Sequence, residues 1–378
     1  MRPDPIRRIV AKVATVTPKT RWLFVEVTTA AGLQGVGEGT LTGREDAVIA
    51  SISHFAGVLL DGRDAAPSAL PATPLPSLPQ AAAFSALDQA LWDVVARRQG
   101  QQMAEALGVP LRATVPLYAN INRRTLDRSP ASFAASAQDA LAAGHQAFKI
   151  APFDEVTPAA RQAGELAEAI KPGLARMQAV RHAIGPDLRL MVDCHWRLDE
   201  AAAERVIDAA AEASLHWVEC PLPENEGTLA ALRRLRGRAN RHGMLLAGCE
   251  ECIRVEGFQP FIQAGSYDVL MPDAKYVGGL EEMLRLAEVM RLAGIQFSPH
   301  NPSGPVCHAA SLHVCAVLPN LHSLESQFDE TPLFDGLAGQ SLQRVVGGEA
   351  SLPAGAGLGM VLQPIEAAML QQRAWTAS

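Results

Sequence analysis

The sequence contains no apolar run of membrane-spanning length, no basic tract and no apolar stretch near its first residues. A membrane helix needs about 20 consecutive apolar residues. Proteins that bind nucleic acid usually carry a cluster of lysines and arginines, whereas this chain has a formal net charge of −7. A secretion signal would need an apolar core close to Met1. We therefore expect a cytoplasmic protein whose partners include neither a membrane nor a nucleic acid.

Two motifs that often identify cofactor sites are incomplete. The glycine-rich stretches Gly35–Gly39 and Gly355–Gly359 lack the third glycine of the dinucleotide-binding pattern G-x-G-x-x-G. Cys249 and Cys252 have the C-x-x-C spacing, but no second such pair accompanies them, which argues against a zinc or redox site. A chain of this size without a secretion signal is expected to keep its six cysteines reduced.

The second half of the chain alternates short apolar runs with amphipathic stretches, which is typical of a parallel (β/α) barrel. A bare barrel takes about 250 residues, so a chain of 378 residues must contain a further unit. Helical periodicity is clear at 130–143, 200–213 and 280–293. The eight expected barrel strands cover residues 115–118, 146–150, 188–193, 215–219, 244–247, 269–271, 295–297 and 321–324.

The first 113 residues follow a different pattern, which indicates a small α+β domain. A strand-forming run at Arg21–Thr29 is followed by a turn and by a return strand at Val36–Glu38, within a meander that begins at Ile6. Residues 65–79 are rich in proline and alanine and are expected to form a loop. Residues 81–98 have apolar positions at helical spacing.

Five reactive side chains lie where expected barrel strands end, at intervals of 23 to 31 residues: Asp193, Glu219, Glu250, Asp273 and His300. One strand–helix unit of a barrel takes roughly 30 residues. The spacing therefore predicts that the five side chains surround one mouth of the barrel. Polar residues at the carboxyl ends of barrel strands are typically catalytic, so the pattern indicates an enzyme.

The three acids Asp193, Glu219 and Glu250 are expected on consecutive strand ends. Three neighbouring carboxylates cannot all ionise without a counter-charge. An all-oxygen ligand set suits Mg²⁺, with Mn²⁺ as an alternative. The other reading is that the three are separate, solvated acids on loops. Glu251 is a rival ligand because the step from Glu219 to Glu250 is longer than its neighbours.

Asp273 and His300 follow on the next two strands, and a carboxylate beside a histidine makes the histidine a base. Without such a partner, His300 would be an ordinary turn residue. His195 follows Asp193 by two residues, so alternation places both on the same face of the strand. His195 could be a general acid, a fourth metal ligand or a packed polar residue.

Two further charged residues close expected strands. Lys149, at the end of the second strand, could neutralise a substrate carboxylate, act as a base or be a solvated lysine. A lysine at this position could also form a Schiff base in an aldolase, although clustered carboxylates do not serve that chemistry. Glu325 closes the eighth strand and is expected to face the metal across the barrel.

Several stretches resemble the enolase superfamily, and within it the branch of mandelate racemase and the acid-sugar dehydratases. The meander around Val25–Glu38 and the helix Ala86–Asp93 resemble its capping domain. Trp217–Pro221 resembles a ligand-bearing strand, although Cys220 stands where the family has a second acid. Met271–Gly279 resembles the strand with the aspartate of the Asp–His dyad. The resemblance covers nearly the whole chain.

The resemblance implies an α/β fold, a modified (β/α)7β TIM-type barrel over residues 114–345 with an α+β cap over residues 1–113. The tail Pro353–Gly359 resembles the family segment that returns to the cap, so residues 346–378 are expected to do the same. A homo-oligomer, either a dimer or an octamer, is also implied. The implied roles are Mg²⁺ ligation by Asp193, Glu219 and Glu250, an Asp273–His300 base, and donation by Glu325 to the developing enolate.

Two departures from the racemases favour dehydration. The racemases carry Lys-x-Lys on the second strand, and Ala151 replaces the second lysine of Lys149-Ile-Ala151, so that base is missing. Asp193-Cys-His195 and Ser298–Pro305 resemble the galactonate dehydratases, in which a histidine after the first ligand protonates the departing hydroxyl. The sequence thus predicts a metal-dependent lyase that removes water from a polyhydroxy carboxylate.

In the predicted reaction, His300 removes the α-proton, and Lys149 with a protonated Glu325 stabilises the enediolate. His195 then protonates the leaving hydroxyl, and the product becomes a 2-keto-3-deoxy acid. We expect the cap to close the site through Arg21 or Trp22. The alternatives are an epimerase or cycloisomerase with His195 and His300 as opposed bases, the aldolase, and a non-catalytic metal-binding scaffold.

Overall fold

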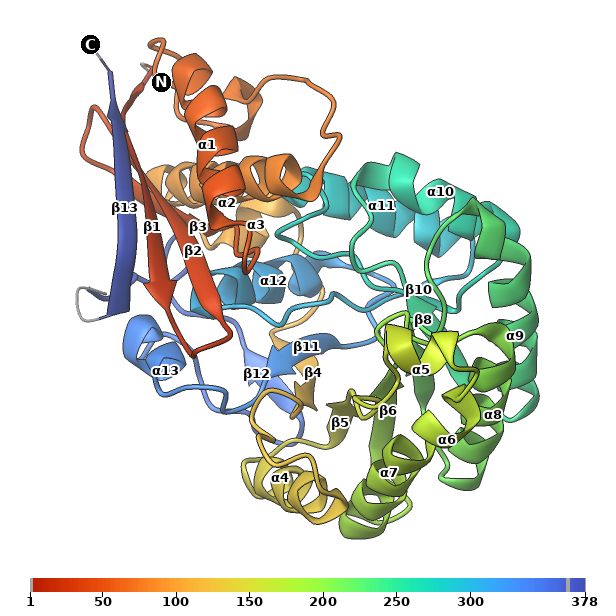
Figure 1. Ribbon diagram of the computed structural model, residues 1–378. Coiled ribbons are helices and arrows are strands. Elements are labelled where there is room, and N and C mark those ends of the chain that lie inside the picture. The colour runs from red at the N-terminus through yellow and green to blue at the C-terminus, as the bar shows by residue number, and fades with distance from the viewer. Residues whose placement is uncertain (1–2, 365–367, 378) are drawn as a thin grey trace.

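The computed structural model describes residues 3–364 and 368–377, and two sheets organise them (Figure 1). One is a four-stranded antiparallel sheet in the order β13-β1-β2-β3. The other is a parallel sheet in the order β10-β9-β8-β7-β6-β5-β4-β11 that curls into a barrel. The predicted barrel with an α+β cap is therefore confirmed.

The antiparallel sheet is the predicted meander with one strand added from the far end of the chain. Strands β1 (Ile6–Thr15), β2 (Arg21–Thr29) and β3 (Gln34–Glu38) follow one another, and β13 (Met369–Thr376) pairs with β1. Residues 1–2, 365–367 and 378 of the expected cap and returning segment lie outside the described residues. Helices α1 (Glu45–Leu59) and α2 (Leu78–Gln99) lie on this sheet, and α3 (Met103–Leu107) packs against α2 and α12. A 3₁₀ turn forms at Pro67–Ala69 in the expected loop.

Helix α2 lies directly on the backbone of β3 because β3 has glycines where the two elements touch. A Cβ atom added to Gly37 would come within 1.9 Å of the carbonyl oxygen of Ala86, and one added to Gly35 within 2.1 Å of that of Ala90. Both positions have no room for a side chain. The alternation of glycine in this strand is therefore a packing requirement and not a dinucleotide-binding motif.

All eight barrel strands form where the sequence predicts them, with ends that differ by a few residues. The eighth strand begins later than expected, and Leu321 forms only an isolated bridge to Phe297, which closes the barrel between β10 and β11. The strands are β4 (Thr114–Asn120), β5 (Ala147–Ile150), β6 (Arg189–Asp193), β7 (Trp217–Glu219), β8 (Leu245–Gly248), β9 (Val269–Leu270), β10 (Gln296–Phe297) and β11 (Leu324–Gln327).

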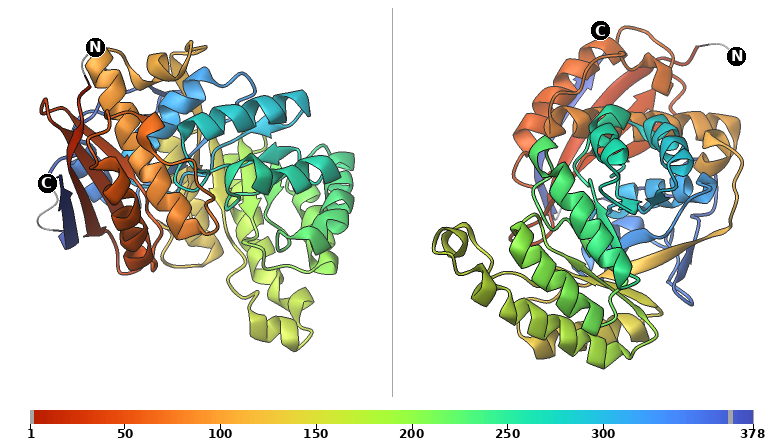
Figure 2. Two further views of the ribbon diagram at one scale, coloured as in Figure 1. Left: turned by 90° about the horizontal axis from the view of Figure 1, so that it is seen from above. Right: turned by 90° about the vertical axis from the view of Figure 1, so that its right-hand side faces the viewer.

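Helices cover the outside of the barrel, and the position after β11 holds only the short α13 and strand β12 (Glu349–Ser351), which pairs with β4. The yellow-green segment with α5 and α6 projects from the body in both views of Figure 2. No described helix has the length and apolar composition needed to cross a bilayer. The helices are α4 (Pro130–Ala142), α5 (Pro158–Gln162), α6 (Leu166–Ala169), α7 (Lys171–Ile184), α8 (Glu200–Glu212), α9 (Leu229–Arg241), α10 (Arg254–Ala264), α11 (Leu280–Leu292), α12 (Pro305–Val317) and α13 (Leu333–Ala338).

Buried polar side chains of the cap bind the barrel segments that carry the expected dyad. The Glu38 carboxylate accepts hydrogen bonds from the backbone N–H groups of Gly304 and Cys307, at the start of α12. The Asp88 carboxylate accepts one from the N–H of Leu280, at the start of α11. Because the N-terminus of a helix has free N–H groups and a partial positive charge, a buried carboxylate is favourable there.

We predict that Gly37→Ala destabilises the fold by about 1–3 kcal/mol, since overpacked positions cost roughly that much. The matched control is Gly57→Ala in α1, where an added Cβ meets nothing within 4 Å. The control should be neutral or stabilising by about 0.5–1 kcal/mol because alanine favours a helix. Urea unfolding of both variants measures the difference, and equal stabilities would contradict the close packing of α2 on β3.

Candidate active site

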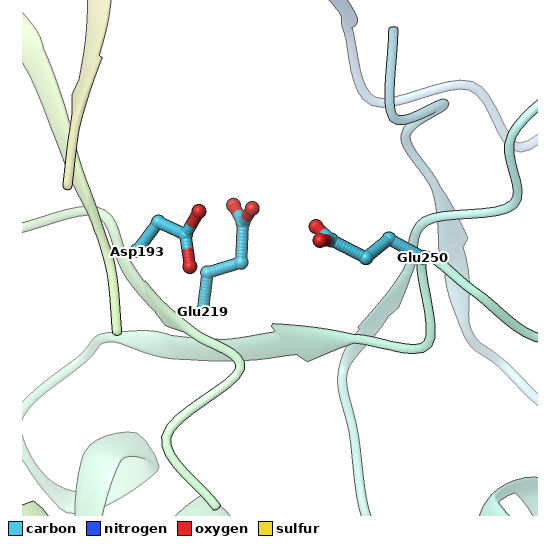
Figure 3. A group of neighbouring side chains, drawn as sticks. All are labelled: Asp193, Glu219 and Glu250. Carbon is cyan, nitrogen blue, oxygen red and sulfur yellow. The ribbon is translucent and has the colours of Figure 1, made fainter. Parts of the chain in front are cut away.

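Three carboxylates meet at the carboxyl-terminal mouth of the barrel. Asp193 and Glu219 end the neighbouring strands β6 and β7, where they are paired in register. Glu250 follows β8 and points toward the other two acids (Figure 3). Each of the three offers an oxygen atom within 4.8 Å of the others, and all three side chains are buried. The prediction that these acids lie together is thus fulfilled, whereas the reading as separate, solvated acids is wrong.

Burial and mutual repulsion make this cluster unstable as three anions. Burial raises the pKa of Glu219 to about 8. Burial, followed by the charges of Asp193 and Glu219, raises the pKa of Glu250 well above its ordinary value. The Oε2 atom of Glu250 has no hydrogen-bond partner among the described residues. A hard divalent cation fits this arrangement, because it supplies the missing positive charge and prefers carboxylate oxygens.

The structure distinguishes Glu250 from Glu251, which the sequence left as an alternative metal ligand. Glu250 is 5% exposed and belongs to the carboxylate group. Glu251 is exposed and lines the outer part of the cavity instead. The long sequence step arises because Glu219 is in register with Ala247, so Glu250 lies three residues beyond the register position.

Lys149 lies between two acids inside the barrel. Its Nζ atom is 2.6 Å from Oε1 of Glu219 and 3.0 Å from Oε1 of Glu325. Burial alone would lower the pKa of Lys149, but the charges of Glu219 and Glu325 outweigh burial and raise the pKa well above its ordinary value. The side chain is 2% exposed, so the reading as a solvated lysine is wrong.

Glu325 on β11 is surrounded by donors, which corrects the expectation that it is protonated. Its Oε1 accepts hydrogen bonds from Asn120 Nδ2 and lies beside Lys149, while its Oε2 accepts one from the backbone N–H of Asn301. Burial would raise the pKa of Glu325, but the charge of Lys149 and the hydrogen bonds from Asn301 and Asn120 oppose burial, and the pKa is lowered. Both oxygens therefore act as acceptors, and the carboxylate form is favoured.

Asp273 and His300 form the expected pair. The Nδ1 atom of His300 is 2.8 Å from Oδ2 of Asp273, and its Nε2 atom is 3.5 Å from Oε2 of Glu250. Since the carboxylate accepts, Nδ1 carries the hydrogen and Nε2 is free to take a proton. The ammonium of Lys275 donates to the same Oδ2 atom at 2.6 Å. Burial would raise the pKa of Asp273, but Lys275 and His300 outweigh it and lower the pKa.

His195 lies on the other side of the carboxylate group. Its Nε2 atom is 2.8 Å from Oδ2 of Asp193, and its backbone N–H donates to Oδ1 of the same residue. The charge of Asp193 raises the pKa of His195. The His195 side chain is 38% exposed, so it faces the cavity and is not a packed core residue.

The cavity above these residues has a volume of about 310 Å³ and is closed on one side by the cap. Thr40 and Thr42 supply the cap's part of the lining. The expected Arg21 and Trp22 do not: Trp22 is buried, and Arg21 is paired with Glu45. The site is therefore completed by the segment that follows β3.

Several lining residues were missed by sequence reasoning, although some left a signal. Lys275 follows Asp273 by two residues, as His195 follows Asp193, and the same alternation could have identified it. Asn120 extends the alternation of β4 beyond Tyr118 in the same way. No comparable sequence pattern indicates Arg123 or Tyr276. Arg123 lies on the loop after β4, and the hydroxyl of Tyr276 donates to the carbonyl oxygen of Thr40 in the cap, so tertiary structure places both in the lining.

Two family models match the chain. The model described as "Enolase C-terminal domain-like" matches residues 132–366, and the model described as "Mandelate racemase / muconate lactonizing enzyme, N-terminal domain" matches residues 2–108.

Among similar proteins, the D-gluconate dehydratase of Thermoproteus tenax is 29% identical over 76% of this chain, a match that spans only 55% of that protein's length. A D-galactonate dehydratase family member of Streptomyces bingchenggensis (strain BCW-1) is 27% identical over 82% of this chain and 81% of that protein.

Solved structures agree on the fold. A mandelate racemase/muconate lactonizing enzyme-like protein from Roseovarius sp. TM1035 has a TM-score of 0.82 and 26% identity, and the match covers 95% of this chain and 93% of that chain. A mandelate racemase/muconate lactonizing enzyme from Jannaschia sp. CCS1 has a TM-score of 0.84 over 97% of this chain and 98% of that chain. Because the Jannaschia protein is only 24% identical to this chain, its similarity concerns the fold alone.

We predict that Glu250→Gln weakens Mg²⁺ or Mn²⁺ binding by more than about 10-fold, because even outer-sphere changes cost about 10–100-fold. Glu251→Gln, its matched neighbour, should leave the affinity within about twofold of the unmodified chain, since that side chain lies outside the carboxylate group. Calorimetric titration with either ion measures the affinities.

The metal-free Glu250→Gln variant should also unfold at a higher temperature than the unmodified metal-free chain, because a neutral amide replaces a buried carboxyl group whose ionised form is disfavoured by burial and repelled by Asp193 and Glu219. A stronger effect of Glu251→Gln on metal affinity would make Glu251 the ligand.

Proposed function

The chain belongs to the mandelate racemase/muconate lactonizing enzyme family of the enolase superfamily, and on this premise we propose that it is a Mg²⁺-dependent dehydratase of acid sugars. The observation that carries the proposal is the pair of histidines on two sides of one carboxylate group. His195 contacts Asp193, and His300 contacts Glu250. The relatives named gluconate and galactonate dehydratase support the substrate class.

Asp193, Glu219 and Glu250 would hold the metal ion. When bound, Mg²⁺ would act as a Lewis acid toward the substrate carboxylate, which contributes several kcal/mol to stabilising developing negative charge. The Nε1 atom of Trp217 donates to Oε2 of Glu219 at 3.0 Å, and Lys149 donates to its Oε1 atom. These two contacts fix the orientation of the Glu219 carboxylate before any ion arrives.

His300 is the proposed base. Its Nε2 atom faces Glu250, so it lies beside the place where a substrate carboxylate would bind, and the α-carbon is adjacent to that carboxylate. Asp273 holds the ring in the tautomer that leaves Nε2 free. Nε2 would take the α-proton, and the electrons of the C–H bond would move onto the substrate carboxylate.

Lys149 would stabilise the enediolate that results. Its ammonium is held between Glu219 and Glu325 and stays charged, so a fixed positive charge faces the developing oxyanion. Such preorganised charges are effective because they need no reorientation during the reaction. Glu325, as a carboxylate, acts by holding Lys149 and Asn120 in place and not by donating a proton.

His195 is the proposed acid. Its protonated ring would give a proton to the β-hydroxyl as the C–O bond breaks, and water would leave. The enol would then tautomerise to a 2-keto-3-deoxy acid. The raised pKa of His195 beside Asp193 favours the protonated ring that this step requires.

Epimerisation is the second candidate, because the same two histidines could act as opposed bases. Deuterium wash-in at the α-carbon without loss of water would identify it. A Schiff-base aldolase is disfavoured by the surroundings of Lys149, whose ammonium is paired with two carboxylates and is not a free amine nucleophile.

We predict that His300→Asn abolishes both dehydration and exchange of the α-proton in D₂O, since no other base lies at that position. Asp273→Asn should impair the same step, because the neutral amide no longer stabilises a positive His300 ring and its NH₂ group can donate to Nδ1, which selects the wrong tautomer. Proton NMR measures both rates on the same sample. Exchange at the unmodified rate in His300→Asn would mean that another residue is the base.

The dehydratase assignment is tested by His195→Asn on a substrate found by screening acid sugars for keto-acid formation. This variant should lose water elimination by about 10²–10⁴-fold, the usual contribution of general acid catalysis, while retaining α-proton exchange. The base and the carboxylate group remain intact, so the enediolate would still form and be reprotonated. His242→Asn, on the surface at the end of α9, is the control. Unchanged dehydration in His195→Asn would favour epimerisation.

A further inference from the structure

Two arginine–carboxylate pairs join the loop after β4 to the segment after β11, and one of them faces the cavity above the carboxylate group. Strands β4 and β11 are paired in parallel, so the segments that follow them are neighbours (Figure 1). Nη1 of Arg123 lies 3.2 Å from Oε2 of Glu330, and Nη1 of Arg124 lies 2.7 Å from Oδ2 of Asp329. Arg123 lines the cavity, whereas Arg124 does not. The side chain of Asp329 is 58% exposed and that of Glu330 only 4%, so Arg123–Glu330 is the inner pair and Arg124–Asp329 the outer one.

The inner pair is held in place from both sides. Oε1 of Glu330 accepts a hydrogen bond at 2.5 Å from Oγ1 of Thr20, in the turn between β1 and β2 of the cap. On the barrel side, the guanidinium of Arg128 donates to the backbone and side-chain oxygens of Asn122, the residue before Arg123. The loop that carries Arg123 is therefore ordered before a ligand binds, which reduces the entropic cost of binding to it.

Arg123 has hydrogen-bond donors that no described residue uses. A guanidinium carries five N–H donors, and the contact with Glu330 uses one of them. Within the described part of the chain the remaining donors have no partner. The side chain is 34% exposed, so these donors are accessible to a molecule in the cavity.

Arg123 lies across the barrel mouth from the place where the substrate carboxylate would bind. Strands β4 and β8 are four strands apart in either direction around the closed barrel, and Glu250 follows β8. His195 and His300 follow β6 and β10, which lie halfway between β4 and β8 on the two sides. A substrate whose carboxylate lies beside Glu250, with its reacting carbons between the histidines, therefore extends its remaining carbons toward Arg123.

The charges of the lining favour a substrate tail without a second carboxylate. Each lysine or arginine of the described lining already contacts a carboxylate, in the pairs Lys149–Glu219, Lys149–Glu325, Lys275–Asp273 and Arg123–Glu330. A second carboxylate on the substrate would thus meet no uncompensated lysine or arginine, and an unbalanced charge in a partly buried site is costly. Neutral hydroxyl groups can accept hydrogen bonds from Arg123 without that cost.

We propose that Arg123 is a specificity-determining residue that donates to hydroxyl groups of the substrate tail, and that the substrate is an aldonate, an acid sugar with one carboxylate and an uncharged far end. Glu330 is its positioning residue. It cancels the charge of Arg123 and so disfavours aldarates, which carry a second carboxylate at the far end. This inference rests on the proposed dehydration of acid sugars and specifies which acid sugars the site accepts.

The first test compares acid sugars that differ at the far end. D-gluconate with D-glucarate, and D-galactonate with galactarate, are titrated by calorimetry into the full chain loaded with Mg²⁺. In at least one pair the aldonate should bind at least about fivefold more tightly, because a unit charge at about 4 Å has an effect of that order even in water. A smaller difference in every pair that binds, or a preference for the aldarate, would overturn the inference. Absence of binding by all four compounds would instead remove the proposed function, and the inference with it.

Arg123→Met removes the donors and keeps an unbranched side chain. For the preferred aldonate, kcat/KM should fall by about 10–100-fold, the contribution of one or two hydrogen bonds from a charged donor. Most of the change should be in KM, since the carboxylate group and both histidines are untouched. Arg124→Met, in the outer pair, is the matched control and should change kcat/KM by less than about twofold. Equal effects of the two variants would refute the role of Arg123.

Glu330→Gln should change the specificity in the opposite direction, which a merely structural role would not do. The amide can still accept from Arg123 and can donate to the hydroxyl of Thr20, but the charge of Arg123 is no longer cancelled. Binding of the aldarate relative to the aldonate should rise by about fivefold or more. Asp329→Asn, in the outer pair, should leave that ratio within about twofold. An unchanged ratio in Glu330→Gln would overturn the charge argument.

The double variant Arg123→Met/Glu330→Gln keeps the test decisive if the single Arg123 variant is unstable, because it leaves no unpaired buried carboxylate. It should show the same loss of kcat/KM for the aldonate as Arg123→Met is expected to show, without the gain in aldarate binding of Glu330→Gln. Unmodified affinity of the double variant for the aldonate would refute contact between Arg123 and the substrate tail.

Discussion

The balance of buried charge at the barrel mouth is the constraint on which the rest of the structure depends. Two lysines cannot neutralise five buried carboxylates, and the shortage of positive charge is concentrated on the side of Glu250. Isolated charges are costly in a protein interior. Donors accordingly contact Glu219, Asp273 and Glu325, whereas Oε2 of Glu250 has no hydrogen-bond partner among the described residues. The two lysines are Lys149 and Lys275, and the five carboxylates are those of Asp193, Glu219, Glu250, Asp273 and Glu325.

The same use of buried carboxylates joins the cap to the barrel. Glu38 and Asp88 come from the cap, and each accepts hydrogen bonds at the start of a barrel helix. Gln89 donates to the carbonyl oxygen of Ala274, immediately after Asp273. The segments that hold the Asp273–His300 pair are thus fixed by the cap as well as by the sheet. Consequently the geometry of the base depends on both parts of the molecule.

Much of the fold could be predicted from the sequence because strand–helix alternation and the acids at strand ends are local patterns. The place of Glu250 beside Asp193 and Glu219 was predicted correctly even though Glu250 lies beyond its register position, since its apolar run ends nearby. The ionisation of Glu325 was not predictable, because it is set by Asn120, Lys149 and Asn301, which are distant in sequence. The prediction that Arg21 or Trp22 closes the site was wrong for the same reason. Contacts between the cap and the barrel decide which cap residues reach the cavity, and these contacts join residues that are distant in sequence.

The backbone beyond the strand ends shows how the positions of the acids are held. His195, Cys220 and Cys249 all have positive φ angles, of 47°, 45° and 70°, in a region that residues other than glycine rarely adopt. Each lies next to or close after an acid of the carboxylate group. The N–H of Cys220 donates to the carbonyl oxygen of Ala247, and the N–H of Cys194 to that of Glu219, so each turn is held by the next strand.

Such backbone conformations cost roughly 1–3 kcal/mol each and persist only where surrounding structure fixes them. Because the turns after Asp193 and Glu219 are each held by the next strand, displacement of one of these acids would disturb the next, whereas the N–H of Cys249 is held by the carboxylate of Glu224. The buried cysteines beside the acids are therefore best understood as small residues that fit strained turns and not as a redox or zinc motif. The turns that follow β6 and β7 are thus each tied to the next strand, and this linkage helps to keep the acids of the carboxylate group in their relative positions.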